Sequence, residues 1–197
     1  WPPLKGSEMS TTAAGPRHFL RDDDLSPEEL VEVLDLADEL KRDRFGSRPL
    51  AGPRSVAVLF DKASTRTRLS FSVGISELGG YPLVLDGQTS QMGRGESIED
   101  TARVLDRQCE AIVWRTHGQE RVEAMASASR VPVVNALTDT CHPCQILADI
   151  FTFIEQRGPI QGKTVAWIGD SNNMCNTWLQ AAEVLDFNVH VSTPPGY

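Results

Sequence analysis

Residues 55–71, with the sequence SVAVLFDKASTRTRLSF, constrain the fold of this chain more than any other stretch. They open with an apolar run, residues 56–60, as expected of a strand that is buried in a parallel sheet. After a polar segment, apolar residues return at helical spacing from Leu69 onward. A polar turn therefore joins a buried strand to a helix, which is typical of an α/β protein.

This turn carries the residue types that bind phosphate. The N–H groups and the dipole of a helix N-terminus attract anions, and the hydroxyls of Ser64, Thr65 and Thr67 add donors. The guanidinium groups of Arg66 and Arg68 can each bind two phosphate oxygens. Because open α/β sheets bind ligands beyond the carboxyl ends of their strands, we predict a phosphate site here. The alternative is a surface arginine pair beside an ordinary helix cap.

Strand and helix patterns alternate along the rest of the chain. Strands are expected at 81–85, 111–114, 131–134, 164–168 and 188–192, and helices at 97–106, 119–129, about 145–155 and 174–185. Ser26, Pro27 and Glu29 mark the start of an earlier helix, whose apolar residues between Leu30 and Leu40 we expect to face the core. The predicted fold is a parallel sheet with helices on both faces.

The chain divides into three parts. Residues 1–16 resemble a leader and a short polar tail, and residues 17–157 form the first α/β domain. Residues 158–197 begin with a connector that contains Pro159 and continue as the first βαβ unit of a second, Rossmann-like α/β domain. Because one βαβ unit cannot cover both faces of its sheet, we expect this second domain to be incomplete.

Composition narrows the classes of partner. A net charge of −8 argues against a general nucleic-acid or membrane-surface binder, so any anion site must be local. The sequence contains neither an apolar run that could span a bilayer nor a signal for export, which favours the cytoplasm.

The four cysteines are expected to be reduced thiols: Cys109, Cys141, Cys144 and Cys175. Zinc at the segment 141–144 is disfavoured, since a structural site needs about four ligands and only Cys175 is near in the sequence. We expect no metal and no other cofactor.

A second group of polar residues follows two other predicted strands. Arg115 ends the strand at 111–114, and His142 and Gln145 lie beyond the strand at 131–134. If the ligand is a small acyl phosphate, these three side chains can donate hydrogen bonds to its carbonyl oxygen, where negative charge develops during transfer. Taken singly, Arg115 reads as a surface charge and His142 as a loop histidine; their joint position at one sheet edge favours the site.

The sequence STRTR after a buried strand, with Lys62 before it, resembles the carbamoyl phosphate signature of the aspartate and ornithine carbamoyltransferase family. The sequence HPCQ at 142–145 is similar to a second motif of that family. The resemblance implies that Arg115, His142 and Gln145 contact the carbamoyl group. It also implies direct attack of an uncharged amine on carbamoyl phosphate, without a covalent enzyme intermediate, so Cys144 is not a nucleophile.

Three further features resemble the ornithine branch of this family. Gln91 matches a loop glutamine that reaches the site of a neighbouring subunit, which implies a homotrimer or a multiple of trimers. Lys62, and the absence of lysine from residues 86–96, favour ornithine over aspartate. Asn173, with Asn172 as its alternative, matches an asparagine that binds ornithine. The product would be citrulline.

Two alternatives stay open at this point. The acceptor could be another amine, such as putrescine or N-acetylornithine, or aspartate. The chain could also be a phosphate-ligand binding module without catalysis, since the later ornithine motifs of the family are absent from it. Ser72 replaces a glutamate that is common in the family, which puts one supporting contact in doubt.

Overall fold

The computed structural model describes residues 15–87 and 89–196. Most of the predicted leader, residues 1–14, lies outside this range. The main sheet contains four parallel strands in the order β2-β1-β3-β4. Their bounds are β1 (Ser55–Phe60), β2 (Tyr81–Asp86), β3 (Ala111–Arg115) and β4 (Val133–Leu137). The predicted parallel α/β sheet is confirmed.

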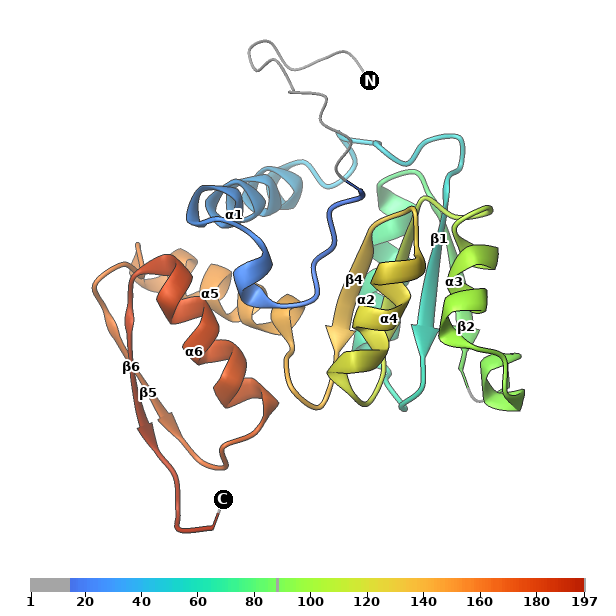
Figure 1. The fold of residues 1–197 in the computed structure, drawn as a ribbon. Helices are drawn as coiled ribbons and strands as arrows, with labels where there is room; N and C mark the ends of the chain where they lie inside the picture. Colours follow the sequence, from blue (N-terminus) through green and yellow to red (C-terminus); the bar gives the residue numbers. More distant parts are fainter. Residues whose placement is uncertain (1–14, 88, 197) are drawn as a thin grey trace.

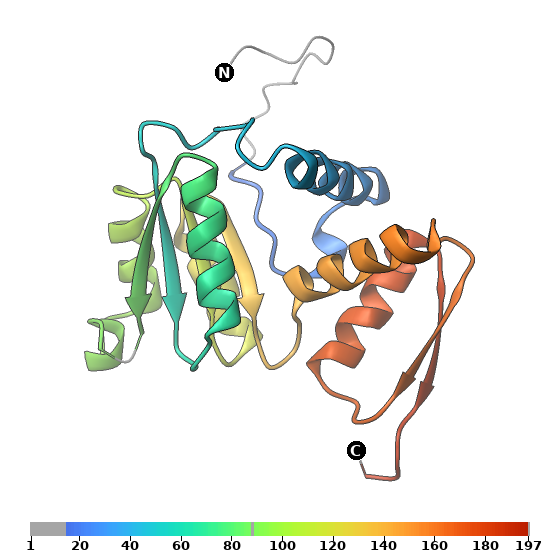
Figure 2. The same cartoon turned by 180° about the vertical axis from the view of Figure 1, so that it is seen from behind.

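Helices cover both faces of this sheet. Helix α2 (Arg66–Glu77) lies on one face, and α3 (Ile98–Leu105) and α4 (Gln119–Ala128) lie on the other (Figures 1 and 2). Side chains of β1 alternate between two cores, since successive strand residues point to opposite faces. Leu59 packs with Trp114 and Met125, whereas Val58 packs with Ile75 of α2. The run 56–60 is therefore buried on both sides, as its composition predicts.

Strand β4 begins two residues later than the expected start at 131 and continues beyond Asn135. Pro132 has no N–H, so it enters the ladder only through its carbonyl, which accepts from the N–H of Ile112 at 2.9 Å. Asn135 is buried inside the strand, where its Nδ2 donates to the carbonyl oxygen of Leu20 at 2.9 Å. The nitrogen of this buried amide has an acceptor, so Asn135 does not end the strand.

Helix α1 (Pro27–Arg42) has the predicted capping box. The Oγ of Ser26 accepts from the N–H of Glu29 at 3.2 Å, and the carboxylate of Glu29 accepts from the N–H of Ser26 at 2.8 Å. The prediction that the apolar residues between Leu30 and Leu40 all face the core is wrong, because Leu36 is 51% exposed while Leu30 and Leu34 are buried. This helix packs by one narrow stripe against α5 and α6, away from the main sheet.

Helix α5 (Pro143–Arg157) leads from β4 to a second unit, made of β5 (Thr164–Ile168), α6 (Asn173–Leu185) and β6 (Asn188–Ser192). Strands β5 and β6 are parallel, and α6 packs on one face of the pair through Ala181 and Leu185. The other face is open, with Ile168 83% exposed. This confirms the expected βαβ unit.

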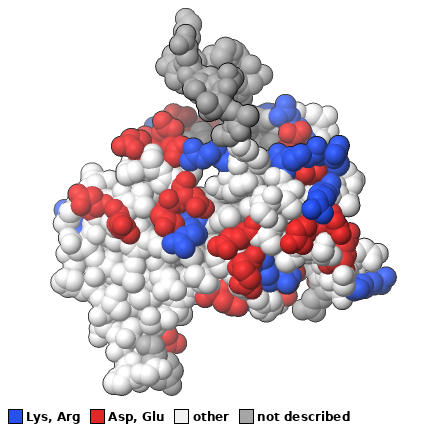
Figure 3. Space-filling model, in the orientation of Figure 1, with Lys and Arg blue, Asp and Glu red and all other residues white. Residues whose placement is uncertain are grey.

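The surface differs between the two parts of the molecule. On the face shown in Figure 3, acidic and basic side chains are interspersed over the main α/β part, and the surface over α6 and the β5–β6 pair carries few charges. Within residues 15–87 and 89–196, no helix has the length and apolarity to cross a membrane.

Candidate functional site

The carboxyl ends of β1, β3 and β4 surround a cleft of about 860 Å³. Three segments supply its polar lining: the β1–α2 turn, the end of β3 and the start of α5. The sequence-predicted residues that line it are Ser64, Thr65, Arg66, Thr67, Arg115, His142 and Gln145. Residues far apart in the sequence thus meet because parallel strands end at one edge of the sheet.

The β1–α2 turn presents an open helix N-terminus to the cleft. Thr65 is the N-cap residue of α2, and its side chain forms no hydrogen bond to the N–H groups of the first turn. No acidic residue lies in that turn, and Thr65 and Arg66 are exposed. The N–H groups and the positive dipole are therefore directed at the cleft without a competing cap or carboxylate, which suits an anion.

Arg68 does not line this cleft. Residues two apart on a helix point about 200° apart, so Arg66 and Arg68 lie on different sides of α2. The guanidinium of Arg68 stacks over the ring of Phe60, with its carbon 4.8 Å from the ring centre, and lines a neighbouring cleft with Lys62. The structure does not form the expected clamp of two arginines from one turn.

Arg115 takes the second cationic position instead. Its Nη1 donates to Thr67 Oγ1 at 3.3 Å, so the end of β3 is joined directly to the β1–α2 turn. Burial lowers the pKa of Arg115, and the positive charge of Arg66 lowers it further. Two guanidinium groups thus face one cleft, and an anion between them would relieve their repulsion.

His142 is the N-cap residue of α5 and is only 9% exposed. Burial and, secondarily, the charge of Arg115 lower the pKa of its imidazole to about 4. The ring is therefore neutral at pH 7 and carries one N–H donor. Its Nδ1 is buried and forms no hydrogen bond within the described part of the chain.

Two neighbours of His142 on α5 differ in their freedom. The exposed Gln145 donates from Nε2 to Asp149 Oδ1 at 2.9 Å, so its amide is held at the wall of the cleft. Cys144 lies 3.4 Å, measured from Sγ, from the carbonyl oxygen of Asn135. Burial raises the pKa of the Cys144 thiol to about 12, so it stays protonated and is a poor nucleophile.

Three predicted residues lie outside the cleft. Gln91 is exposed at the N-cap of the short 3₁₀ helix η2 (Met92–Arg94). Asn172 caps α6, where its Oδ1 accepts from the N–H groups of residues 174 and 175 at 3.0 and 3.3 Å. Asn173 donates from Nδ2 to the carbonyl oxygen of Thr138 at 3.0 Å. Met174, which sequence reasoning missed, is the residue of this turn that lines the cleft.

Lys62 forms an ion pair with Asp139, which follows β4, and does not line the main cleft. His117 Nδ1 lies 3.9 Å from the other oxygen of that carboxylate. Across residues 15–87 and 89–196, no cluster of three or more His, Cys, Asp or Glu side chains is arranged to hold a metal ion.

Comparison with known proteins places the chain in one family. Residues 17–155 match the family described as aspartate/ornithine carbamoyltransferase, carbamoyl-P binding domain. The ornithine carbamoyltransferase of Clavibacter sepedonicus is 57% identical over 182 residues, which cover 92% of this chain and 59% of that protein. The corresponding protein of Bifidobacterium longum subsp. infantis is 58% identical over 185 residues, covering 92% and 58%.

Solved structures show the same similarity. The crystal structure of ornithine carbamoyltransferase from Burkholderia thailandensis has a TM-score of 0.86 at 49% identity, covering 92% of this chain and 63% of that one. The enzyme from Thermus thermophilus gives a TM-score of 0.87 at 42% identity, covering 93% and 64%. The chain spans 58% to 60% of the length of the curated relatives it matches.

Proposed function

Because this chain belongs to the aspartate/ornithine carbamoyltransferase family, we propose that it is the carbamoyl phosphate-binding part of an ornithine carbamoyltransferase. The reaction transfers the carbamoyl group of carbamoyl phosphate to the side-chain amine of L-ornithine and yields L-citrulline and phosphate. The observation that carries the proposal is the shared cleft, where a hydroxyl-rich helix N-terminus faces Arg115 and His142.

The phosphate group binds at the β1–α2 turn in this proposal. Ser64, Thr65 and Thr67 donate hydroxyl hydrogen bonds, and the N–H groups at the start of α2 add to them. Arg66 supplies a bidentate guanidinium contact, which is stronger than a bond between neutral groups. We leave Arg68 out of this clamp because it lies on the other side of α2.

The carbamoyl group lies toward β3 and α5. Arg115, His142 and Gln145 donate to its carbonyl oxygen, which becomes negatively charged in the tetrahedral intermediate. The neutral imidazole of His142 donates one N–H and adds no positive charge beside Arg115. Attack by the uncharged amine forms the new C–N bond, and collapse of the intermediate breaks the C–O bond to phosphate while the amine loses a proton.

In this proposal, the turn before α6 and a loop of a neighbouring subunit complete the site. We assign Asn173, with Asn172 as its alternative, to the amino-acid end of ornithine, because the turn before α6 also brings Met174 to the cleft. Gln91 is exposed on a loop after β2 and is available to a neighbouring copy of the chain. We infer a homotrimer, or a multiple of trimers, in which this glutamine completes the adjacent site.

The proposal is tested by calorimetric titration of the chain with carbamoyl phosphate, followed by colorimetric detection of citrulline after ornithine is added. Putrescine, N-acetylornithine and aspartate serve as matched acceptors. We expect saturable binding of carbamoyl phosphate. If the chain transfers the carbamoyl group, we expect no other amine to be a better acceptor than ornithine. A folded chain that does not bind carbamoyl phosphate, or one that prefers another amine, would contradict the proposal.

A further inference from the structure

One face of α6 holds the loop that carries His142. Polar residues at positions 173, 176 and 177 share this face, because residues three and four apart lie side by side on a helix. Asn173 and Asn176 donate to the carbonyl oxygens of residues 138 and 140, at 3.0 and 3.2 Å. Thr177 Oγ1 accepts from the backbone N–H of His142 at 3.3 Å. The second unit of the chain therefore supports a residue of the first unit's cleft.

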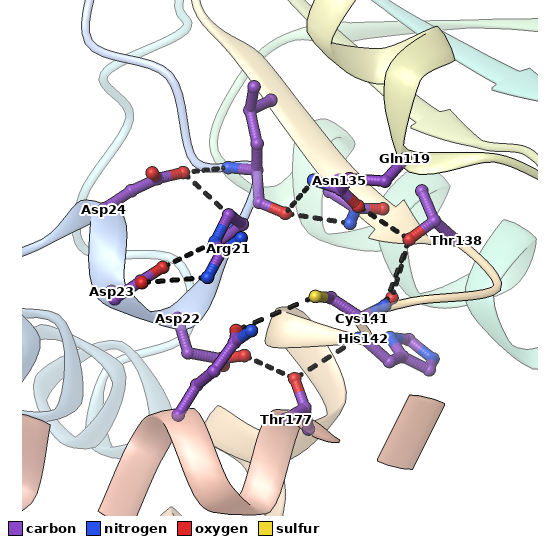
Figure 4. Close-up of polar contacts among 12 residues, drawn as sticks. Arg21, Asp22, Asp23, Asp24, Gln119, Asn135, Thr138, Cys141, His142 and Thr177 are labelled. Carbon is purple, nitrogen blue, oxygen red and sulfur yellow. Dashed lines mark hydrogen bonds and ion pairs between the residues drawn. The ribbon is translucent and has the colours of Figure 1, made fainter. Parts of the chain in front are cut away.

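Thr177 also contacts the carboxylate of Asp22, which lies on the short 3₁₀ helix η1 (Asp22–Asp24) near the start of the described chain (Figure 4). The three groups form a continuous series from Asp22 through the hydroxyl of Thr177 to the N–H of His142. Asp22 is 2% exposed, Thr177 is 0% exposed and His142 is 9% exposed. Water therefore has little access to these contacts.

The carboxylate sets the direction of the hydrogen bonds. A hydroxyl has one hydrogen, and that hydrogen points to Asp22 because an ionised carboxylate only accepts. A lone pair of the Thr177 oxygen then faces the N–H of His142. Helix α5 begins at Pro143, which has no N–H. The N–H of His142 is therefore the last backbone donor before the helix, and its bond to Thr177 holds it in place.

The buried carboxylate of Asp22 has an energetic cost that packing does not explain. No Lys or Arg forms an ion pair with it among the described residues, and burial raises its pKa to about 6, against the lowering effect of its bond from Thr177. With the amide of Gln180 turned to satisfy both its neighbours, its nitrogen lies 3.2 Å from Asp22 Oδ2 and its oxygen 3.3 Å from Arg21. A buried carboxylate without a cation costs free energy. Such costs are commonly found where a protein positions functional groups.

On the premise of the proposed function, we propose that Thr177 and Asp22 are positioning residues for His142. They hold its backbone so that the imidazole meets the carbonyl oxygen of carbamoyl phosphate. Neither residue lines the cleft, so both act through His142 and not on the ligand. The phosphate-binding turn belongs to β1 and α2 and shares none of these contacts.

This separation gives a selective test. Thr177→Val keeps the shape of the side chain and removes the hydroxyl, so the buried N–H of His142 loses its acceptor. We expect the affinity for carbamoyl phosphate to fall about tenfold and the affinity for inorganic phosphate to stay unchanged, because only the carbamoyl group contacts His142. Thr177→Ser restores a hydroxyl and should restore the affinity. Thr101→Val is the matched control, since its buried Oγ1 forms no hydrogen bond to any described residue.

The outcomes separate the two proposals. If the unmodified chain does not bind carbamoyl phosphate, the proposed function fails. If it binds and Thr177→Val binds as tightly, the positioning role is overturned. An equal loss for carbamoyl phosphate and inorganic phosphate also overturns it, because a general structural defect produces that pattern. Failure of Thr177→Ser to recover the affinity would show that the hydroxyl is not the cause.

A second measurement needs no variant at position 177. Protonation of Asp22 frees the Thr177 hydroxyl to turn, so the backbone amide resonance of His142 should shift with a midpoint near pH 6 in an NMR titration. The ionisable groups around Asp22 are Arg21, Asp23 and Asp24 of its own segment, the Cys141 thiol of the facing loop and the Cys144 thiol of α5. The described residues of α6 that contact Asp22, Thr177 and Gln180, are neutral.

The control for this titration is Asp22→Asn, in which the transition near pH 6 should disappear from the His142 amide. Because burial lowers the pKa of the His142 imidazole to about 4, its titration should be distinguishable from that of Asp22. A His142 amide that does not move between pH 5 and pH 7, or one that moves equally in Asp22→Asn, would overturn the inference even if Thr177→Val fails to fold.

Discussion

Replacing Arg66 with alanine should weaken the binding of carbamoyl phosphate by about 2 kcal/mol, which is about 30-fold in Kd. Arg66 begins α2, is exposed and lines the cleft. It forms no ion pair with an acidic side chain in the part of the chain that the structure describes. No ion pair within the described residues is therefore lost, and the change reports mainly the bond to phosphate, a charge-assisted contact worth about 1.5–3 kcal/mol.

The assay is calorimetric titration of matched variants, each checked for an unchanged unfolding temperature. Arg66→Lys should recover only part of the affinity, because an ammonium group keeps the charge and loses the planar fork. Arg103→Ala is the charge-matched control: Arg103 lies on α3, on the other face of the sheet, and pairs with Asp100 at 2.6 Å. We expect it to bind as the unmodified chain does.

Two results would contradict a phosphate contact from Arg66. A Kd for Arg66→Ala within about twofold of the unmodified value would remove Arg66 from the phosphate site. An equal loss in Arg103→Ala would show that net charge, and not a local contact, governs the affinity.

Three further predictions concern the site and the core. The imidazole of His142 should remain neutral from pH 8 down to about pH 5, with an NMR midpoint near pH 4. Its pKa in the folded chain lies below the ordinary 6.5, so the unfolded chain takes up a proton first as the pH falls. The free energy of unfolding should therefore be unaffected by this group above pH 6.5 and should decrease as the pH drops from 6.5 toward 4. A midpoint near 6.5 would show that the ring is solvated. Cys144→Ala should keep carbamoyl phosphate binding, since the pKa of its thiol is raised to about 12; loss of binding with an intact fold would give the thiol a role. On α1, Leu34→Ala should lower the free energy of unfolding by about 2–5 kcal/mol, whereas Leu36→Ala should change it by about 0.5 kcal/mol or less in denaturant titrations; equal losses would contradict the narrow packing stripe.

The sequence predicted the parallel sheet because its signals are local. Apolar runs such as 56–60 are buried on both faces, and the capping box at Ser26 lies within one helical turn. The face of α1 could not be read in the same way. Its apolar residues are compatible with a broad core contact, and only the position of α1 over α5 and α6 decides that Leu36 is left exposed.

Some features of the candidate site also follow from local sequence, and others depend on the tertiary fold. The motif predicted that residues 64–67 lie beyond a strand, and helical geometry then places Arg66 and Arg68 on opposite sides of α2. That consequence could have been drawn from the spacing alone. The bond from Arg115 to Thr67 spans 48 residues of sequence and depends on the strand order, so no local pattern reveals it.

Asp22 and Thr177, which are in contact, lie still further apart in the sequence. Their contacts join the first described helix to α6 across 155 positions, and they depend on how the second unit packs against the first. In the sequence, Asp22 is one of three consecutive aspartates and carries no distinguishing signal. Burial and its contact with Thr177 distinguish it from Asp23 and Asp24, both of which are exposed.

The position of the carbamoyl phosphate site can be tested directly by an NMR map of backbone amide shifts as carbamoyl phosphate is added to the ¹⁵N-labelled chain. If the cleft at the ends of β1, β3 and β4 is the site, the largest shifts will fall on the amides of Thr65, Arg66 and Thr67 and on His142. Inorganic phosphate will shift the first three and leave His142 in place. Shifts confined to the neighbouring cleft, around Lys62 and Arg68, would contradict the assignment.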